Sequence, residues 1–471
     1  MLRKAPGDIG IATARREFHQ SSSQSNSIPD SCKFPPSTES RFVTVKRGHS
    51  ASRKKFAGVN PLPTMNWELR HATSAERHHR RLLDQFGQIE TVNGDPNFPT
   101  ATDTWGGNDS VTATITQPEA EVTIFGDDNT TLHGQSHGGN DTLTVNFNYG
   151  WNAALVVGDA QAMTDDARGG NDTIDVENGS MYTNVHAFGD VAGDMSGSSH
   201  GGSDTIIGAV GWRDYDNVYA GDAGGSMSGT AQGGNDTLDI SLNTMEGSAI
   251  ASGDAIGSIS GDAIGGNDNI TFTFGANIVW TGGFAYGDSA TSLTDNTQGG
   301  DDILTLKTGG PDTLQLTNPA LYGDAPTMSG NADGGNDILT GGATNDFLYG
   351  DAKVYNPATP GSITGGRDIL NGGTGNDELS GGGNSDTFVF NTGSGNDLIT
   401  DFDQGNKAVG STATEHDLIN VGDYGFADWT ALSSLISDNT AGDAVIHLSA
   451  SDTITLDGVH AASLHPTDFL I

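Results

Sequence analysis

A Gly-Gly pair followed within a few residues by an aspartate recurs along most of this chain, about every 32 residues. The pairs begin at positions 106, 138, 169, 201, 233, 265, 299, 334 and 365. Gly-Asp dipeptides keep step with them, beginning at positions 126, 158, 189, 221, 253, 287, 323 and 350. Two marks with one period indicate a repeat architecture, in which each short unit buries its apolar face against its neighbours.

Apolar residues alternate with polar ones after each aspartate, as at Leu143, Val145 and Phe147. A period of two predicts a strand with one face turned inward, and the Gly-Gly pair predicts a tight turn. We therefore predict an all-β fold, a parallel β-solenoid or β-roll whose equivalent positions stack at roughly 4.8 Å. The sequence leaves open whether one 32-residue unit makes one coil or two.

Charge divides the chain into two parts. Residues 1–95 carry fifteen Lys or Arg and nine Asp or Glu, a net charge of +6, whereas residues 96–471 carry six basic and 51 acidic residues, a net charge of −45. We predict that 1–95 is a mostly disordered basic segment. A capping box at Thr73–Glu76 predicts one short helix over 74–86. The composition of the first 64 residues also leaves Met65 as an alternative start.

The charge and the apolar pattern also limit the partners of the chain. The acidic part should repel nucleic acid and attract cations. The basic segment has few aromatic residues among its charges, so we expect no nucleic-acid partner. The chain contains no run of about 18 apolar residues, so we expect no membrane span. The one cysteine, Cys32, excludes an internal disulfide.

Stacked turn aspartates would repel one another unless a cation lay between them. Carboxylate and carbonyl oxygens suit Ca²⁺, which accepts 6–8 oxygen ligands in a flexible geometry. Zn²⁺ is disfavoured, because residues 96–471 contain no cysteine and their eight histidines follow no ligand spacing. The alternative is that Asn, Asp and Gly are simply good turn residues and bind nothing; this explains the turns but not the charge.

The pattern tightens within residues 334–399. Residues 372–379 read GGTGNDEL, which fits the nonapeptide G-G-x-G-x-D-x-U-x and resembles the RTX, or haemolysin-type, calcium-binding repeat. The resemblance implies a parallel β-roll in which turn carbonyls and aspartate carboxylates bind Ca²⁺ between successive coils. The metal-binding positions that it implies are Asp337, Asp346, Asp351, Asp368, Gly372, Gly373, Gly375, Asp377, Asp386 and Asp397.

The longer repeats of residues 96–333 resemble the family only in the Gly-x-Asp half of the turn. Extending the resemblance to them implies further calcium ligands at Asp141, Asp172, Asp236 and Asp268. The aspartates of the Gly-Asp marks are either second ligands or plain turn residues, and the sequence does not decide between the two. They include Asp159, Asp222, Asp254 and Asp324.

The last segment, residues 400–471, contains less glycine. Residues 427–436 predict a short amphipathic helix, and GDAVIHLSASDTITLDGV after it reads as strands. The terminal Asp468-Phe469-Leu470-Ile471 resembles the uncleaved signal of type I secretion substrates, with an ordinary terminal strand as the alternative. The resemblance implies a type I exporter as partner, an extracellular location and folding driven by calcium after export.

Enzymatic motifs are scarce, and we expect no enzyme. The sequence has no H-E-x-x-H motif, and GSSHG at 197–201 matches the G-x-S-x-G elbow only as text, at a position of the repeat. We expect a secreted calcium-binding repeat protein with a structural or surface role. The alternatives are an RTX toxin or hydrolase-associated protein, or a repeat adhesin.

Overall fold

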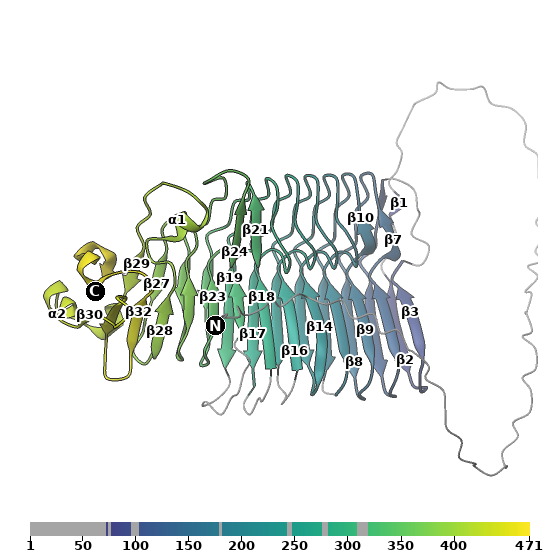
Figure 1. The fold of residues 1–471 in the computed structure, drawn as a ribbon. Coiled ribbons are helices and arrows are strands. Elements are labelled where there is room, and N and C mark those ends of the chain that lie inside the picture. The colour runs from purple at the N-terminus through teal and green to yellow at the C-terminus, as the bar shows by residue number, and fades with distance from the viewer. Residues whose placement is uncertain are drawn as a thin grey trace, which may run out of the picture. The chain divides into compact units, whose positions relative to one another are not determined.

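The computed structural model describes residues 72–73, 77–95, 103–178, 181–242, 247–275, 281–308 and 319–471. These residues belong to the compact unit Glu68–Ile471, and they form a parallel β-solenoid. The expected disorder of the first sixty residues lies outside the described part. Successive coils lie side by side, each adding one strand to each of two long sheets (Figure 1).

Sheet 1 has 13 strands within the described residues, all paired in parallel. In spatial order they are β2 (His78–Leu83), β5 (Ser110–Ile115), β8 (Thr142–Phe147), β11 (Thr173–Asn178), β13 (Thr205–Val210), β15 (Thr237–Leu242), β17 (Asn269–Phe274), β19 (Ile303–Thr308), β22 (Ile338–Thr340), β25 (Ile369–Asn371), β27 (Thr387–Val389), β29 (Leu418–Asn420) and β33 (Phe469–Leu470). The alternation predicted for these strands is confirmed: Leu143 and Val145 are fully buried.

Sheet 2 has 14 strands within the same described residues. They are β3 (Ile89–Asn93), β6 (Glu121–Phe125), β9 (Ala153–Val157), β12 (Asn184–Phe188), β14 (Asp214–Ala220), β16 (Gly247–Ser252), β18 (Thr281–Tyr286), β20 (Ala320–Tyr322), β23 (Phe347–Tyr349), β26 (Glu378–Ser380), β28 (Asn396–Ile399), β32 (Thr453–Leu456), β31 (Ala444–His447) and β30 (Ile436–Asp438). Only the last three strands of this order pair antiparallel.

Each 32-residue repeat makes one coil. The chain runs along sheet 1, turns, runs along sheet 2, and then forms a lobe before it re-enters sheet 1, as β8, β9 and residues 158–172 do in one coil. A first apolar core lies between the two sheets. A second fills the lobes, where Met163, Met195 and Met227 stack in register and are fully buried.

Short strands and bridges pair the lobes of neighbouring coils. The strands are β1 (Ala72–Thr73), β4 (Thr104–Trp105), β7 (Asp128–Leu132), β10 (Ala160–Met163), β21 (Thr327–Gly330) and β24 (Val354–Pro357). The lobes disappear near the C-terminus: strand β25 and its neighbour β27 begin only 18 residues apart, at Ile369 and Thr387. Residues 369–399 of the nonapeptide region thus form the same coil without its lobe, whereas the preceding coil of that region still has a lobe, which contains β24.

The helix predicted over 74–86 is wrong. Residues 78–83 form strand β2, which pairs in parallel with β5, and Ile89–Asn93 form β3, which pairs with β6. Pairing with a neighbouring coil outweighs a local capping signal, because each strand gains a full ladder of hydrogen bonds. The first described coil therefore uses residues of the predicted N-terminal segment.

The C-terminal segment follows the sequence pattern more closely. The predicted helix is confirmed as α2 (Trp429–Ser433), whose N-cap Asp428 accepts a hydrogen bond from the backbone N–H of Ala431 at 3.0 Å. Strands β31 and β32 follow it. The other helical turns of this segment are α1 (Gly405–Ala408), η1 (Gly422–Tyr424), η2 (Ala461–Ser463) and η3 (Pro466–Asp468). The last residues form β33, which pairs with β29.

Candidate metal centre

Two aspartates of each lobed coil meet where the lobe joins the sheets; we call this region the neck. The first, the Gly-Asp aspartate, follows a strand of sheet 2. The second, the pre-strand aspartate, directly precedes a strand of sheet 1. All these residues are buried, with 0–3% exposure. The Gly-Asp aspartates are Asp95, Asp127, Asp159, Asp190, Asp222, Asp254, Asp288, Asp324 and Asp351. The pre-strand aspartates are Asp109, Asp141, Asp172, Asp204, Asp236, Asp268, Asp302, Asp337, Asp368, Asp386 and Asp417.

The pre-strand aspartates form a ladder along the solenoid. The backbone N–H of Asp141 donates to Oδ1 of Asp172 at 2.6 Å, and the N–H of Asp172 donates to Oδ1 of Asp204 at 2.6 Å. The same bond recurs from coil to coil as far as Asp417. One carboxylate oxygen of each residue is therefore used to join two coils.

The Gly-Asp aspartates close the neck within each coil. Oδ2 of Asp159 accepts a hydrogen bond from the N–H of Gly170 at 2.8 Å, and Oδ2 of Asp127 accepts from Gly139 at 3.0 Å. These bonds hold the chain that leaves sheet 2 against the chain that returns to sheet 1. The Gly-Asp mark thus lies where the chain leaves sheet 2, and the Gly-Gly mark lies opposite it, where the chain returns to sheet 1.

In nine of the pre-strand aspartates, the second carboxylate oxygen makes no hydrogen bond within the described structure. These buried Oδ2 atoms belong to Asp141, Asp172, Asp204, Asp236, Asp268, Asp302, Asp337, Asp368 and Asp386. A buried polar atom without a partner costs free energy, and a buried charge costs far more. A repeated row of such oxygens indicates that the neck accommodates a positively charged species or protons.

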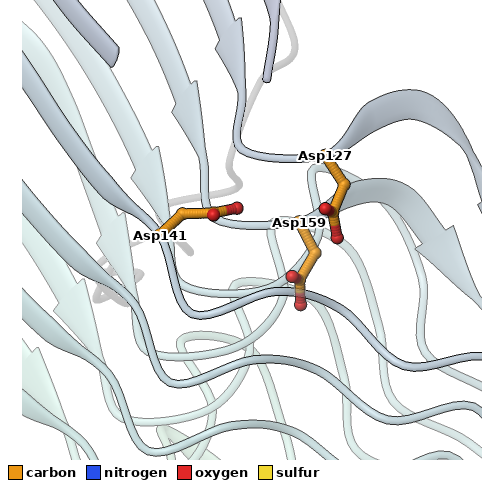
Figure 2. Close-up of side chains that lie close together, drawn as sticks. All are labelled: Asp127, Asp141 and Asp159. Atoms are coloured by element: carbon orange, nitrogen blue, oxygen red, sulfur yellow. The ribbon is translucent and has the colours of Figure 1, made fainter. Parts of the chain in front are cut away.

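Carboxylates of neighbouring coils converge in groups of three. In one group Asp127, Asp141 and Asp159 each offer an oxygen, and these oxygens lie within 4.8 Å of one another (Figure 2). The next two groups are Asp159–Asp172–Asp190 and Asp190–Asp204–Asp222. Adjacent groups share a Gly-Asp aspartate, so the acidic groups form a continuous row rather than isolated sites.

Burial raises the pKa of these carboxyl groups. The pKa of Asp141 rises to about 9, because burial disfavours the charged form and the charge of Asp159 adds to the effect. Burial raises the pKa of Asp159 to about 7, and those of Asp172 and Asp204 lie well above the usual range. The neck therefore destabilises the ionised form of a carboxyl group that has no positive partner. A divalent cation would bind the ionised carboxylates in place of the protons.

The first coil carries a cation of its own. His78 pairs with Ser110, so Arg77 stands in register with the pre-strand aspartate Asp109. The guanidinium of Arg77 forms an ion pair with Asp95 and donates to the carbonyl of Gly94 at 3.1 Å. A positively charged group is thus accommodated in the neck where the sequence provides one.

Close stacking explains the glycine of the Gly-Asp mark. A Cβ atom on Gly158 would lie 1.6 Å from the carbonyl oxygen of Gly189 and 1.9 Å from Oδ2 of Asp172. Gly126 is in the same situation against Gly158 and Asp141. Only glycine leaves room for the carboxylate and the carbonyl of the next coil, so this dipeptide sets the dimensions of the neck.

The metal positions expected from sequence all lie at coil junctions. Asp141 and Asp172 belong to the groups of three, and Asp236, Asp268, Asp337, Asp368 and Asp386 to the pre-strand ladder. Asp346, Asp377 and Asp397 form a second ladder along sheet 2, with N–H to Oδ1 distances of 2.8 and 3.0 Å. Asp346 and Asp377 directly precede β23 and β26, and Asp397 lies within β28. Asp351 is a Gly-Asp aspartate, and Gly372, Gly373 and Gly375 form the turn before Asp377, with positive φ at Gly373 and Gly375.

Three members of the groups were missed in the sequence. Asp127 and Asp190 follow the glycines of the Gly-Asp marks at 126 and 189, and Asp204 ends the GGSD of its repeat. The phase shared by the two marks was the signal that could have found them. Of the Gly-Asp aspartates left open as ligands or turn residues, Asp159 and Asp222 lie in the acidic groups.

Ser199, the central residue of the GSSHG motif, is fully buried in a lobe and follows the lobe turn, not a strand. Within the described residues, no helix is long and apolar enough to cross a membrane.

No protein-family model matches the chain, and no curated protein or solved structure matches it either.

Proposed function

We propose that this protein is a calcium-binding repeat protein whose solenoid is stabilised by cations held in the neck. One observation carries the proposal: buried carboxylates, each with an oxygen that makes no hydrogen bond, recur coil after coil at the neck. A lobed coil contributes two buried carboxylates, at least one of which commonly has such an oxygen, so one divalent cation per coil would balance their charge.

The chemistry of the donors favours Ca²⁺. The described groups contain carboxylates alone, without histidine or cysteine, and hard oxygen ligands suit Ca²⁺ or Mg²⁺. Ca²⁺ tolerates irregular geometry and several carboxylates, whereas Mg²⁺ demands a near-ideal octahedron and keeps its waters. The resemblance of residues 372–379 to the RTX nonapeptide supports the same ion.

The proposal extends to secretion and to a structural or surface role outside the cell, without enzymatic activity. An acidic, glycine-rich chain repels itself and has a large conformational entropy, so it would fold poorly where calcium is scarce. It could pass a type I exporter in that state and fold at extracellular calcium, roughly 10⁻⁴–10⁻³ M. The acidic ladder and the resemblance of the C-terminal tail support this sequence of events.

The test is a circular dichroism titration of the full chain, starting in EGTA. We expect a cooperative gain of β signal with calcium and little gain with the same concentration of magnesium. Isothermal calorimetry on the same samples should give several calcium ions per chain. A β spectrum already complete in EGTA, unchanged on adding calcium, would overturn the proposal.

A further inference from the structure

A hollow on the outer side of the first lobes is not used by the acidic ladder. Its volume is about 240 Å³, and it is lined by Trp105, Gln135, His137, Asp166 and Arg168. These residues come from three successive coils. Backbone bridges place Trp105 beside His137, and His137 beside Arg168, in parallel register. The rigid stacking of the coils therefore fixes their spacing.

The charge of this hollow is unusual for the chain. Residues 96–471 contain only six Lys or Arg, and one of them, Arg168, stands exposed on this column with a histidine in register on each side, His137 and His200. The same column continues with Gln232, Ile264, Gln298 and Asp333. Along this column the basic residues therefore lie at the hollow and in the next coil, and the later coils carry neutral or acidic residues.

The lining also includes an apolar wall and neutral hydrogen-bonding groups. Trp105 is 39% exposed, and its ring lies 4.5 Å from that of His137. Across the hollow, the side-chain amide of Gln135 donates to Oδ2 of Asp166 at 3.3 Å, which holds both side chains in position. An aromatic ring, an amide, a carboxylate and a guanidinium together suit a ring that bears hydroxyl groups and one negative charge.

We propose that this hollow binds an acidic sugar, a uronic acid residue of a polysaccharide. The carboxylate of the sugar pairs with the guanidinium of Arg168, whose planar fork matches a carboxylate. The C–H groups of the ring contact Trp105, and the hydroxyl groups bond to Gln135 and Asp166. The volume is below the roughly 300–1,000 Å³ of sites for drug-sized ligands, which fits a single ring of a chain that continues into solvent.

The test is calorimetry of the full chain in calcium with trigalacturonic acid, with the neutral galactose trisaccharide as the comparison ligand. We expect binding of the acidic trimer and at least tenfold weaker binding of the neutral one. Arg168→Gln and Trp105→Ala should each weaken the acidic trimer about tenfold or more, as expected for loss of a charge-assisted bond or an aromatic contact.

Two variants control for general effects of charge and of aromatic surface. Arg213→Gln removes another of the six basic residues, and Trp151→Ala removes a tryptophan that is 59% exposed at a different turn. Both should bind the acidic trimer as the unaltered protein does, and circular dichroism should show all four variants folded. Equal binding of the two trisaccharides, no binding at millimolar concentration, or unchanged binding in both Arg168→Gln and Trp105→Ala would overturn the proposal.

Discussion

The guanidinium of Arg77 forms an ion pair with the buried carboxylate of Asp95. Arg77 itself stands at the ladder position where every later lobed coil has an aspartate. The first described coil therefore begins with a positive side chain at this ladder position, whereas each later lobed coil begins with a negative one. Comparing the first coil with the later ones indicates that the later necks lack a positive charge to balance their carboxylates. It also makes the first coil the one least dependent on a metal ion.

Replacing Arg77 with glutamine should make the first coil depend on calcium. The variant leaves Asp95 buried without its cation, and breaking one partner of a buried pair costs about 3–5 kcal/mol. Because Arg77 is one-third exposed, we expect a smaller loss, about 1–3 kcal/mol. Thermal melts in EGTA should show a lower Tm, and calcium should restore most of it.

Arg81→Gln is the matched control, because Arg81 pairs with Glu90 across the partly exposed surface of the same coil. Surface pairs contribute about 0–1 kcal/mol, so this variant should barely change the Tm. Equal losses in the two variants would show that the neck gives Arg77 no special role.

Asp204→Asn should have opposite effects with and without calcium. The amide keeps the oxygen that accepts from the N–H of Asp172 and removes a carboxyl group that must either be buried as a charge or take up a proton on folding. In EGTA at pH 8 we therefore expect a higher Tm than in the unaltered protein. In saturating calcium we expect a lower Tm and a lower calcium stoichiometry, because Asp204 belongs to an acidic group.

The control for Asp204→Asn is Asp239→Asn, on an exposed position of β15. It removes the same charge from the solvent face, so the Tm and the stoichiometry should stay nearly unchanged. A loss of stability for Asp204→Asn in EGTA would contradict the view that this carboxylate needs a counter-ion.

Without calcium, stability should fall as the pH rises. The folded protein holds a proton on Asp141 up to a pKa of about 9 and on Asp159 up to about 7, whereas the unfolded chain releases both near pH 4. The folded state thus binds more protons over this window, and each such group removes up to about 1.4 kcal/mol per pH unit. Melts of calcium-free protein should give a higher Tm at pH 5 than at pH 8.

Calcium should reverse this dependence, because protons compete with the ion for the same carboxylates. In excess calcium the Tm should be highest near pH 8 and fall on acidification. A Tm in calcium-free buffer that stays constant from pH 5 to pH 8 would argue against buried, titrating carboxylates in the neck.

Gly158→Ala should prevent the coils on either side from stacking normally. The new methyl group would overlap the carbonyl oxygen of Gly189 and Oδ2 of Asp172, and the backbone cannot yield without separating two strands. We expect a loss of several kcal/mol, on the order of other severe steric substitutions, and weaker calcium binding. Gly422→Ala is the control, since its nearest contact is a side-chain oxygen at 3.3 Å; urea denaturation would compare the two.

Two sequence marks with a common period were sufficient to predict the solenoid. The alternation at Leu143 and Val145 placed the strands of sheet 1 on the correct face, because burial on one side of a sheet dictates a period of two. The pre-strand aspartates followed from the same marks, since each stands directly before its strand. These features depend on residues that are neighbours in the sequence, namely the alternating apolar residues and the turn residues before each strand, so the sequence shows them directly.

Features that depend on a neighbouring coil were harder to predict. The prediction of a helix over 74–86 did not take into account strand β5, which pairs with residues 78–83. Asp127 and Asp190 were missed because the shared phase of the two marks gives their spacing but not the path of the lobe, which returns to the neck a dozen residues later, where the N–H groups of Gly139 and Gly202 donate to them. Such contacts arise from the length of the lobe, which composition does not encode.

The burial of the carboxylate row also affects how long a bound cation would stay in place. Its aspartates are at most 3% exposed, so a cation lodged there would have no direct route to solvent and would leave only when adjacent coils part. Its residence time would then be set by the frequency of local opening, which is rarer in the middle of a cooperative stack than at frayed ends. A chelator added to the assembled solenoid would act from its ends inward, and the loaded protein would persist long after the surrounding calcium had gone.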